Sequence, residues 1–367
     1  MGPDDRICNH SLAVTQHVLS GNPTTSAVMF ATGVIGNLSA LVFLAMRCNK
    51  QSLSLFYVLV TALLMKDLLG TLAVSPLVLT SYATNTTLTG MKNGKELCKY
   101  FGFSMTFLSL ATLATVCAMA QERYLAIGHP YFHERHLNNR CGYITIPVIY
   151  LGCIIFCVTP FVGFGSYVQY CPGTWCFLDM NPKDLRGKLY AGLYATFTLV
   201  MISGTVLCNI SVICHLVKMR QRRRARGQRS RQKSYQRSLS LTEEVEHLLL
   251  LSFITVVFCI CSFPLVLRVY FNLTRAEEKH YSDLAALRML SFNSIIDPWV
   301  FIIFNPSVLR FFWRKLRRPR TPQVSTIKAR PIQPKLVDSS FSTTETASMN
   351  TDRCHDPRAG LSVGSSD

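Results

Sequence analysis

Charged side chains inside apolar stretches are the residues of this chain that point most directly to chemistry. Arg288 lies in the last long apolar stretch. A charge near the middle of a bilayer costs about 2.5–3.5 kcal/mol on insertion scales. Arg288 is close to where its stretch enters the membrane, where the cost is lower, but it still needs an anionic partner. Its planar guanidinium can hold a carboxylate through two hydrogen bonds. The partner is either an anionic ligand or a nearby acid of the chain, Asp283 or Glu278. Arg268 is a rival cation, which we expect to extend toward the lipid headgroups.

Three further charges interrupt apolar sequence. Asp67 and Asp297 are carboxylates in the second and last stretches, and Lys66 directly precedes Asp67. Because adjacent residues on a helix do not face each other, we expect no Lys66–Asp67 pair and assign Lys66 no function. His and carboxylate residues do not converge at metal-ligand spacing, so we expect no metal, no cofactor and no catalytic residue.

The apolar stretches themselves determine the fold class. The chain is 49% hydrophobic and only 16% charged, whereas soluble domains carry about 25% charged residues. A spanning helix needs about 20 apolar residues. Seven stretches meet this length: 27–46, 53–82, 100–121, 141–178, 189–217, 248–267 and 284–304. The sequence therefore predicts an all-α membrane protein, a bundle of seven transmembrane helices.

The remaining sequence divides the chain and orients it. We expect an extracellular tail at 1–23, the helical bundle at 24–304, a short amphipathic surface helix at 305–318 and a disordered cytoplasmic tail at 319–367. The segment 218–237 is dense in Lys and Arg, which places it inside and the N-terminus outside. Its position between two spans favours contact with membrane lipids and argues against nucleic acid.

Extracellular segments carry candidate modification sites. Asn9, Asn85 and Asn272 begin Asn-X-Ser/Thr sequons and are predicted to be glycosylated. Four cysteines also face this oxidising side. We expect Cys98 and Cys176 to form a disulfide that pins the loop after span four across the bundle. Cys8 and Cys171 would then either pair with each other or remain free thiols.

Motifs in these spans resemble a known family. The rhodopsin-like G-protein-coupled receptors share Gly36-Asn37, Asp67, Glu122-Arg123-Tyr124, Pro264 and Asp297-Pro298. The string Gln-Tyr-Cys-Pro-Gly-Thr-Trp-Cys-Phe at 169–177, Arg288 and Trp299 resemble the prostanoid receptors within that superfamily. The resemblance covers 26–312.

The resemblance implies a prostanoid lipid ligand with one carboxylate. Arg288 would hold this carboxylate, and the hydroxyls of Tyr82 and Thr174 would donate to it. Trp175 would pack the loop down or line the pocket. Ser26 would either line the pocket or cap the first helix.

The resemblance also implies a switch. Asp67 and Asp297 would lie in a polar core that is sodium-accessible in related receptors. Arg123, between Glu122 and Tyr124, would pair with Glu122 at rest and meet the G protein when released; otherwise the two form a plain surface ion pair. Pro264 would kink span six, and Trp299 could replace the tryptophan that usually precedes such a proline.

The closest motifs are those of the prostaglandin E receptors, which implies coupling to Gs, a rise in cyclic AMP and a plasma-membrane location. Prostaglandin D and prostacyclin receptors share much of the pattern and stay open. Arrestin and receptor kinases would act on the tail. A seven-helix transporter is the different-class alternative, but the inverted repeats and paired helix breaks it requires are not found.

Overall fold

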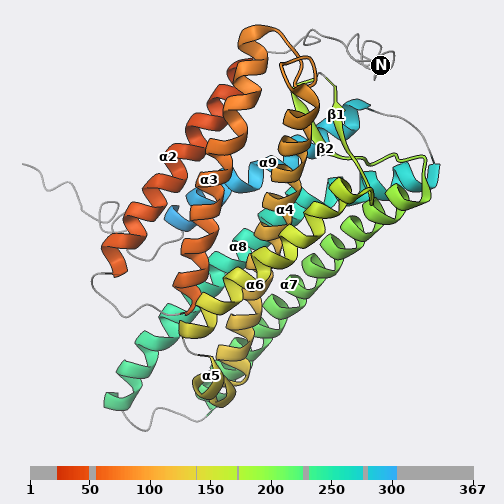
Figure 1. Cartoon of the computed structure of the whole chain (residues 1–367). Coiled ribbons are helices and arrows are strands. Elements are labelled where there is room, and N and C mark those ends of the chain that lie inside the picture. Colours follow the sequence, from red (N-terminus) through yellow and green to blue (C-terminus); the bar gives the residue numbers. More distant parts are fainter. Residues whose placement is uncertain are drawn as a thin grey trace, which may run out of the picture. The chain divides into compact units, whose positions relative to one another are not determined.

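The computed structural model describes residues 23–48, 55–137, 139–171, 173–225, 231–275 and 280–303. Seven helices within these residues are long and apolar enough to cross a membrane, which confirms the predicted spans. They are α2 (Pro23–Cys48), α3 (Leu55–Thr84), α4 (Gly94–Gly128), α6 (Asn139–Val158), α7 (Leu185–Ala225), α8 (Arg231–Arg275) and α9 (His280–Ile303) (Figure 1). The surface helix expected at 305–318 and the tail beyond it lie outside the described residues.

The helix α4 is the centre of the packing. It contacts α3, α6, α7 and α8, and both strands of the loop between α6 and α7. In its spanning segment 72% of the residues are buried, against 17% for α6. Large apolar side chains of α6, such as Val148 and Ile155, remain exposed, as expected of a helix that faces lipid on most sides.

Two regions differ from the sequence expectation. The basic segment 218–237, expected to be a loop, is helical up to Ala225 and again from Arg231, because Lys and Arg are good helix formers. A further short helix, α5 (Pro130–His136), follows α4. The fold is also not purely α-helical, since β1 (Tyr167–Tyr170) and β2 (Trp175–Leu178) form an antiparallel hairpin in the loop after α6 and the 3₁₀ turn Thr159–Val162.

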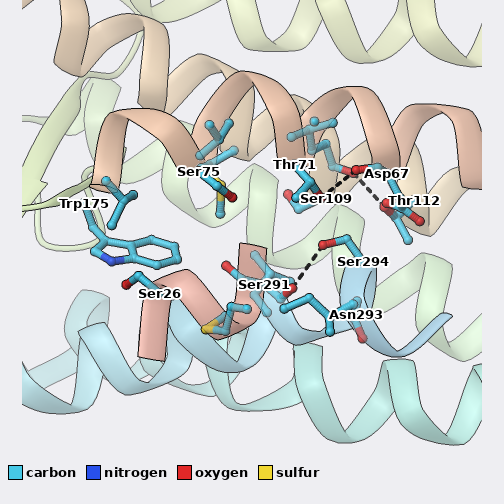
Figure 2. A pocket seen from close by; sticks show the side chains of 18 of the residues that line it. Ser26, Asp67, Thr71, Ser75, Ser109, Thr112, Trp175, Ser291, Asn293 and Ser294 are labelled. Atoms are coloured by element: carbon cyan, nitrogen blue, oxygen red, sulfur yellow. Dashed lines mark hydrogen bonds between the residues drawn. The ribbon is translucent and has the colours of Figure 1, made fainter. Parts of the chain in front are cut away.

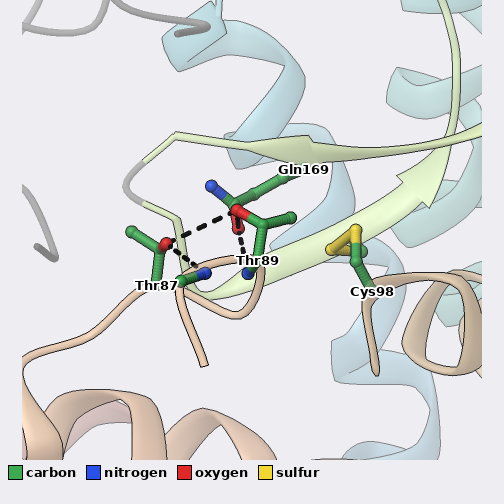
Figure 3. The surroundings of a disulfide bond; sticks show 6 residues. Thr87, Thr89, Cys98 and Gln169 are labelled. Atoms are coloured by element: carbon green, nitrogen blue, oxygen red, sulfur yellow. Dashed lines mark hydrogen bonds between the residues drawn. A yellow bond between two sulfur atoms is a disulfide. The ribbon is translucent and has the colours of Figure 1, made fainter. Parts of the chain in front are cut away.

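The hairpin is fastened to the bundle at several points, and we call it the lid. The predicted Cys98–Cys176 disulfide is present. The side-chain carbonyl of Gln169 accepts hydrogen bonds from the backbone N and the hydroxyl of Thr89, both at 2.9 Å (Figure 3). At the hairpin turn, Gly173 has φ +102°, which favours glycine. The lid is therefore a fixed cover.

A buried tyrosine completes the lid. The hydroxyl of Tyr170 donates to the carbonyl of Leu178 at 2.8 Å and accepts from the backbone N of Met180 at 3.0 Å. Burial raises the pKa of Tyr170 well above its ordinary value, so the phenol keeps the proton it donates. Cys171 is also disulfide-bonded. Its expected partner, Cys8, lies outside the described residues.

Glycine at position 102 sets the distance between α4 and the lid, which gives a stability prediction. A Cβ on Gly102 would lie 2.8 Å from Cγ and 2.9 Å from Cβ of Tyr167. Overpacking of this kind costs about 1–3 kcal/mol. We expect Gly102→Ala to lower the Tm of the detergent-solubilised protein by several degrees.

The matched control is Gly152→Ala in α6, where a Cβ would meet nothing within 4 Å. This substitution should leave the Tm unchanged or raise it slightly, since alanine is the better helix former. An equal loss of Tm in both variants would contradict the proposed contact with the lid.

Candidate functional site

A deep cavity opens beneath the lid and runs inward between α2, α3, α4 and α9. Its empty space, which includes the open mouth, is about 850 Å³. Trp175 and Ser26 lie at one end, and Asp67, Thr112 and Asn293 at the other (Figure 2). From Val78 to Asp67, both lining residues of α3, the helix rises about 16 Å.

The lining alternates apolar side chains with hydroxyls. The apolar surface comes mainly from Met29, Val74, Val78, Met105, Leu108 and Leu290. The hydroxyls come from Ser26, Thr71, Ser75, Ser109, Ser291 and Ser294. Such a cavity suits an elongated apolar molecule that carries a few hydrogen-bonding groups.

The sequence reasoning did not identify most of these hydroxyls, although their spacing contains a usable signal. Asp67, Thr71 and Ser75 follow each other at intervals of four on α3, so they share one helical face. Ser291 and Ser294 are three apart on α9 and continue the face that carries Arg288. Hydroxyl residues that share a helical face with a charged residue thus predict that all of them line the same wall of a cavity.

Of the five predicted ligand-binding residues, Ser26 and Trp175 line the cavity. The capping alternative for Ser26 is wrong, because α2 already begins at Pro23. Trp175 is buried and packs edge-on against Phe101 at 5.9 Å between ring centroids. It therefore both holds the lid down and covers the cavity.

The other three, Tyr82, Arg288 and Thr174, are not lining residues of this cavity, but each is close in sequence to one that is. Tyr82 lies one helical turn beyond Val78, Arg288 one turn before Ser291, and Thr174 directly before Trp175. The Thr174 side chain is fully buried, and its hydroxyl forms no hydrogen bond within the described part of the chain. A buried hydroxyl without a partner is unfavourable, so the Thr174 hydroxyl has an unused hydrogen-bonding capacity.

Arg288 and Arg268 differ in their partners. Arg268 Nε donates to Asp283 Oδ1 at 2.8 Å, so the expectation that Arg268 extends to the headgroups is wrong. Asp283 is an acid within its reach, and the ion pair is the better alternative to solvation. Among the described residues Arg288 forms no ion pair, and Asp283 is not its partner. Glu278 lies outside the described residues.

Asn272 also belongs to this cluster. Its side-chain amide donates to both carboxylate oxygens of Asp283, at 3.2 and 3.3 Å, and the residue is 3% exposed. This arrangement argues against the predicted glycosylation of Asn272, because α8 continues to Arg275 and turns this side chain into the bundle. Asn85 is exposed and stays a predicted glycosylation site. Asn9 lies outside the described residues.

Buried charges at the inner end of the cavity form a polar core. Lys66 Nζ lies 2.7 Å from Asp67 Oδ1, with side chains 4% and 1% exposed. The expectation that these neighbours cannot pair is wrong, because it considered Cβ directions and not the reach of a four-carbon side chain. Asp297 is also buried, and neither carboxylate oxygen accepts a hydrogen bond from the residues described.

Amides connect the helices around this core. Asn37 donates to the carbonyl of Ser294 at 3.0 Å, which joins α2 to α9. Asn293 donates to the hydroxyl of Ser262 at 3.2 Å, which joins α9 to α8 close to Pro264 in that helix. Trp299 lies against α2, since a Cβ on Gly36 would be 2.9 Å from its indole Nε1.

A second ion pair lies near the inner end of α4. Arg123 Nη2 donates to Glu122 Oε1 at 2.6 Å, and Nε contacts Oε2. His133 Nε2 is 3.2 Å from Glu122 Oε1, and the guanidinium lies 4.8 Å from the ring centroid of Phe56. The side chains are only 9% and 4% exposed, so the surface-pair alternative is wrong. The next residue, Tyr124, packs edge-on against the ring of His129.

Comparison with known proteins gives a consistent assignment. Residues 36–301 match the family described as "7 transmembrane receptor (rhodopsin family)". The Prostaglandin E2 receptor EP2 subtype of Mus musculus is 44% identical over 359 residues, covering 92% of this chain and 94% of that protein. The human protein of the same name is 46% identical over 308 residues, covering 79% and 84%.

Two further similarities extend the comparison. The Prostaglandin D2 receptor of Bos taurus is 43% identical over 328 residues, covering 82% of this chain and 91% of its own. The crystal structure of squid rhodopsin superposes with a TM-score of 0.68 at 15% identity, covering 79% and 78% of the two chains. This last likeness concerns the fold alone.

The buried position of Asn272 predicts the glycosylation pattern. Asn85→Gln should remove a glycan and increase the electrophoretic mobility of the protein from mammalian cells, whereas Asn272→Gln should leave the mobility unchanged. Glycosidase-treated samples of each variant serve as the control. A mobility shift with Asn272→Gln that glycosidase abolishes would contradict the buried amide.

Proposed function

This chain belongs to the rhodopsin family of seven-transmembrane receptors, on its prostanoid-receptor branch, and we propose that it binds prostaglandin E and activates Gs. This is the function expected of prostaglandin E receptor subtype two. Its consequence is a rise in cyclic AMP at the plasma membrane. Arrestin and receptor kinases are proposed to act on the tail.

The observation that carries the ligand proposal is the difference between the two outer arginines. Arg268 is neutralised by Asp283, whereas Arg288 has no ion-pair partner in the described chain and lies about one helical turn before Ser291, which lines the cavity. An unpaired guanidinium one helical turn from an apolar cavity favours an apolar molecule with one carboxylate. A prostanoid has this composition.

The rest of the cavity suits the remainder of such a ligand. The two hydrocarbon chains would lie along Val74, Met105 and Leu290, and the ring substituents would meet the wall hydroxyls. We propose that Tyr82 and Thr174 donate to the carboxylate that Arg288 holds, and that Trp175 and Ser26 enclose the ligand. The buried, unpartnered Thr174 hydroxyl supports this placement.

Prostaglandin D is the second candidate ligand. The similarity to Prostaglandin D2 receptors covers most of the chain and is only slightly lower than the similarity to the EP2 subtype proteins. Prostacyclin is the third. All three ligands carry the carboxylate, so the role of Arg288 does not depend on which of them binds.

We propose that Glu122 and Arg123 hold the receptor at rest. The buried pair keeps the guanidinium away from the cytoplasm, with Phe56 against its face and His133 on its carboxylate. Breaking the pair would free Arg123 to meet the G protein. Pro264 in α8 and the Asp67–Asp297 core are the proposed links between the cavity and this pair.

The carboxylate anchor is tested by Arg288→Ala. Cyclic AMP is measured in cells titrated with prostaglandins E, D and I, and we expect prostaglandin E to be the most potent. Hydrogen bonds to charged groups contribute about 1.5–3 kcal/mol each, so the variant should raise the half-maximal concentration at least about tenfold. The methyl ester of prostaglandin E lacks the charge, so Arg288→Ala should reduce its potency much less than that of the acid.

The control removes the other arginine together with its acid, as Arg268→Ala/Asp283→Ala, and leaves no unpaired charge behind. This double variant should keep the preference for the acid over the ester. Surface expression is matched by antibody staining. An Arg288→Ala receptor that still prefers the acid by the original factor would refute the anchor.

The resting pair is tested by Glu122→Gln. Loss of the buried carboxylate frees Arg123, so basal cyclic AMP should rise several-fold without ligand. Glu134→Gln in α5 is the matched control, because this exposed residue makes the same chemical change away from Arg123. Unchanged basal cyclic AMP in a well-expressed Glu122→Gln receptor would show that the pair does not restrain activation.

A further inference from the structure

Lys66 is a buried charge that the proposed receptor function does not use. Its side chain reaches from α3 toward α4, and its ammonium has three oxygen neighbours. These are Asp67 Oδ1 at 2.7 Å, the hydroxyl of Thr112, and the backbone carbonyl of Leu108 at 3.4 Å. An ammonium has three N–H donors, so each donor has an acceptor. The side chain is thus a fully bound cation inside the bundle.

The oxygens around Lys66 are those that would hold a small monovalent cation. Carboxylate, hydroxyl and carbonyl oxygens can replace the hydration shell of such an ion. The family resemblance places a sodium-accessible core at Asp67 and Asp297. Here the ammonium of Lys66 already takes one carboxylate oxygen of Asp67 together with Thr112 and Leu108. A sodium ion at Asp67 therefore does not fit this chain.

A tethered cation also has an advantage over a diffusible one. Its local concentration is set by the side chain that carries it and does not vary with the salt around the cell. Breaking the pair would leave Asp67 buried and uncompensated, which is strongly unfavourable. The charge of Asp67 is consequently balanced whether or not sodium is present.

We propose that Lys66 is a built-in counterion that replaces sodium in the polar core and makes this receptor insensitive to sodium. It acts on the switch through Asp67, as a positioning residue. A competing arrangement is sodium held by Asp297, whose two oxygens accept no hydrogen bond within the described residues. The experiment separates the two.

The test measures the Tm of the purified, full-length receptor without ligand, in sodium chloride and in choline chloride at equal ionic strength. The unsubstituted receptor should show no difference. Lys66→Thr opens the oxygen cluster and keeps a hydroxyl, so this variant should gain a sodium-specific rise in Tm of several degrees. Lys66→Arg keeps the charge and should stay insensitive. The double variant Lys66→Thr/Asp67→Asn also removes the carboxylate, so it should show no sodium-specific rise in Tm.

A sodium-specific rise in Tm of the unsubstituted receptor would overturn the proposal and favour sodium at Asp297. A folded Lys66→Thr receptor without sodium response would overturn it as well. If Lys66→Thr does not fold, the unsubstituted and Lys66→Arg receptors still decide, since either one responding to sodium refutes the built-in counterion. The measurement uses no prostanoid, so a wrong ligand assignment would not affect its outcome.

Discussion

Charge pairing inside the bilayer is the constraint on which the rest of this structure depends. A charge in hydrocarbon is tolerated only with a partner, and three pairs satisfy this rule at three places in the bundle. They are Arg268–Asp283, Lys66–Asp67 and Arg123–Glu122. Arg288 departs from this rule among the cations, because it has no ion-pair partner among the described residues, and Asp297 departs from it among the acids, because its oxygens accept no hydrogen bond there. The exception of Arg288 marks the place where an anion from outside the chain completes the arrangement.

Such a site must also exclude water from the carboxylate, and the lid meets this second requirement. The Cys98–Cys176 disulfide and the Gln169–Thr89 hydrogen bonds hold the hairpin down from two sides. Trp175 can then close the cavity from a fixed position. In the resulting low dielectric, a hydrogen bond between Arg288 and a carboxylate is stronger than it would be in water. A rigid cover and a single unpaired cation thus act together.

Hydropathy predicted the seven spans because their burial in lipid depends on composition alone. Topology placed Cys98 and Cys176 among four cysteines on the same side, and the structure confirms the pairing of these two. Tertiary contacts were harder to predict. Asn272 matches a sequon, but only the length of α8 and the position of Asp283 show that its amide is already used. Likewise, the partner of Arg268 lies on another helix, where sequence spacing gives no information.

Pairs between adjacent residues show a specific limit of reasoning from helical spacing. Neighbouring Cβ atoms diverge by about 100°, which argues against contact between Lys66 and Asp67 or between Glu122 and Arg123. Long side chains overcome this angle when burial removes the alternative of solvation. The cavity hydroxyls were missed for the opposite reason. Each is unremarkable alone, and the information lies in the register of Thr71 and Ser75 with Asp67 and of Ser291 and Ser294 with Arg288.

The two inner ion pairs are connected through the α3–α4 contact. The helix α3 supplies Lys66, Asp67 and the ring of Phe56 that covers Arg123, while α4 supplies Thr112 beside Lys66 and the Glu122–Arg123 pair itself. A change in how α3 lies on α4 would therefore act on both pairs at once. Because Asp67 also lines the inner end of the cavity, a ligand that reaches this depth can act on the same contact. The charges that make the fold possible in a membrane thus lie along the route between the cavity and the C-terminal end of α4.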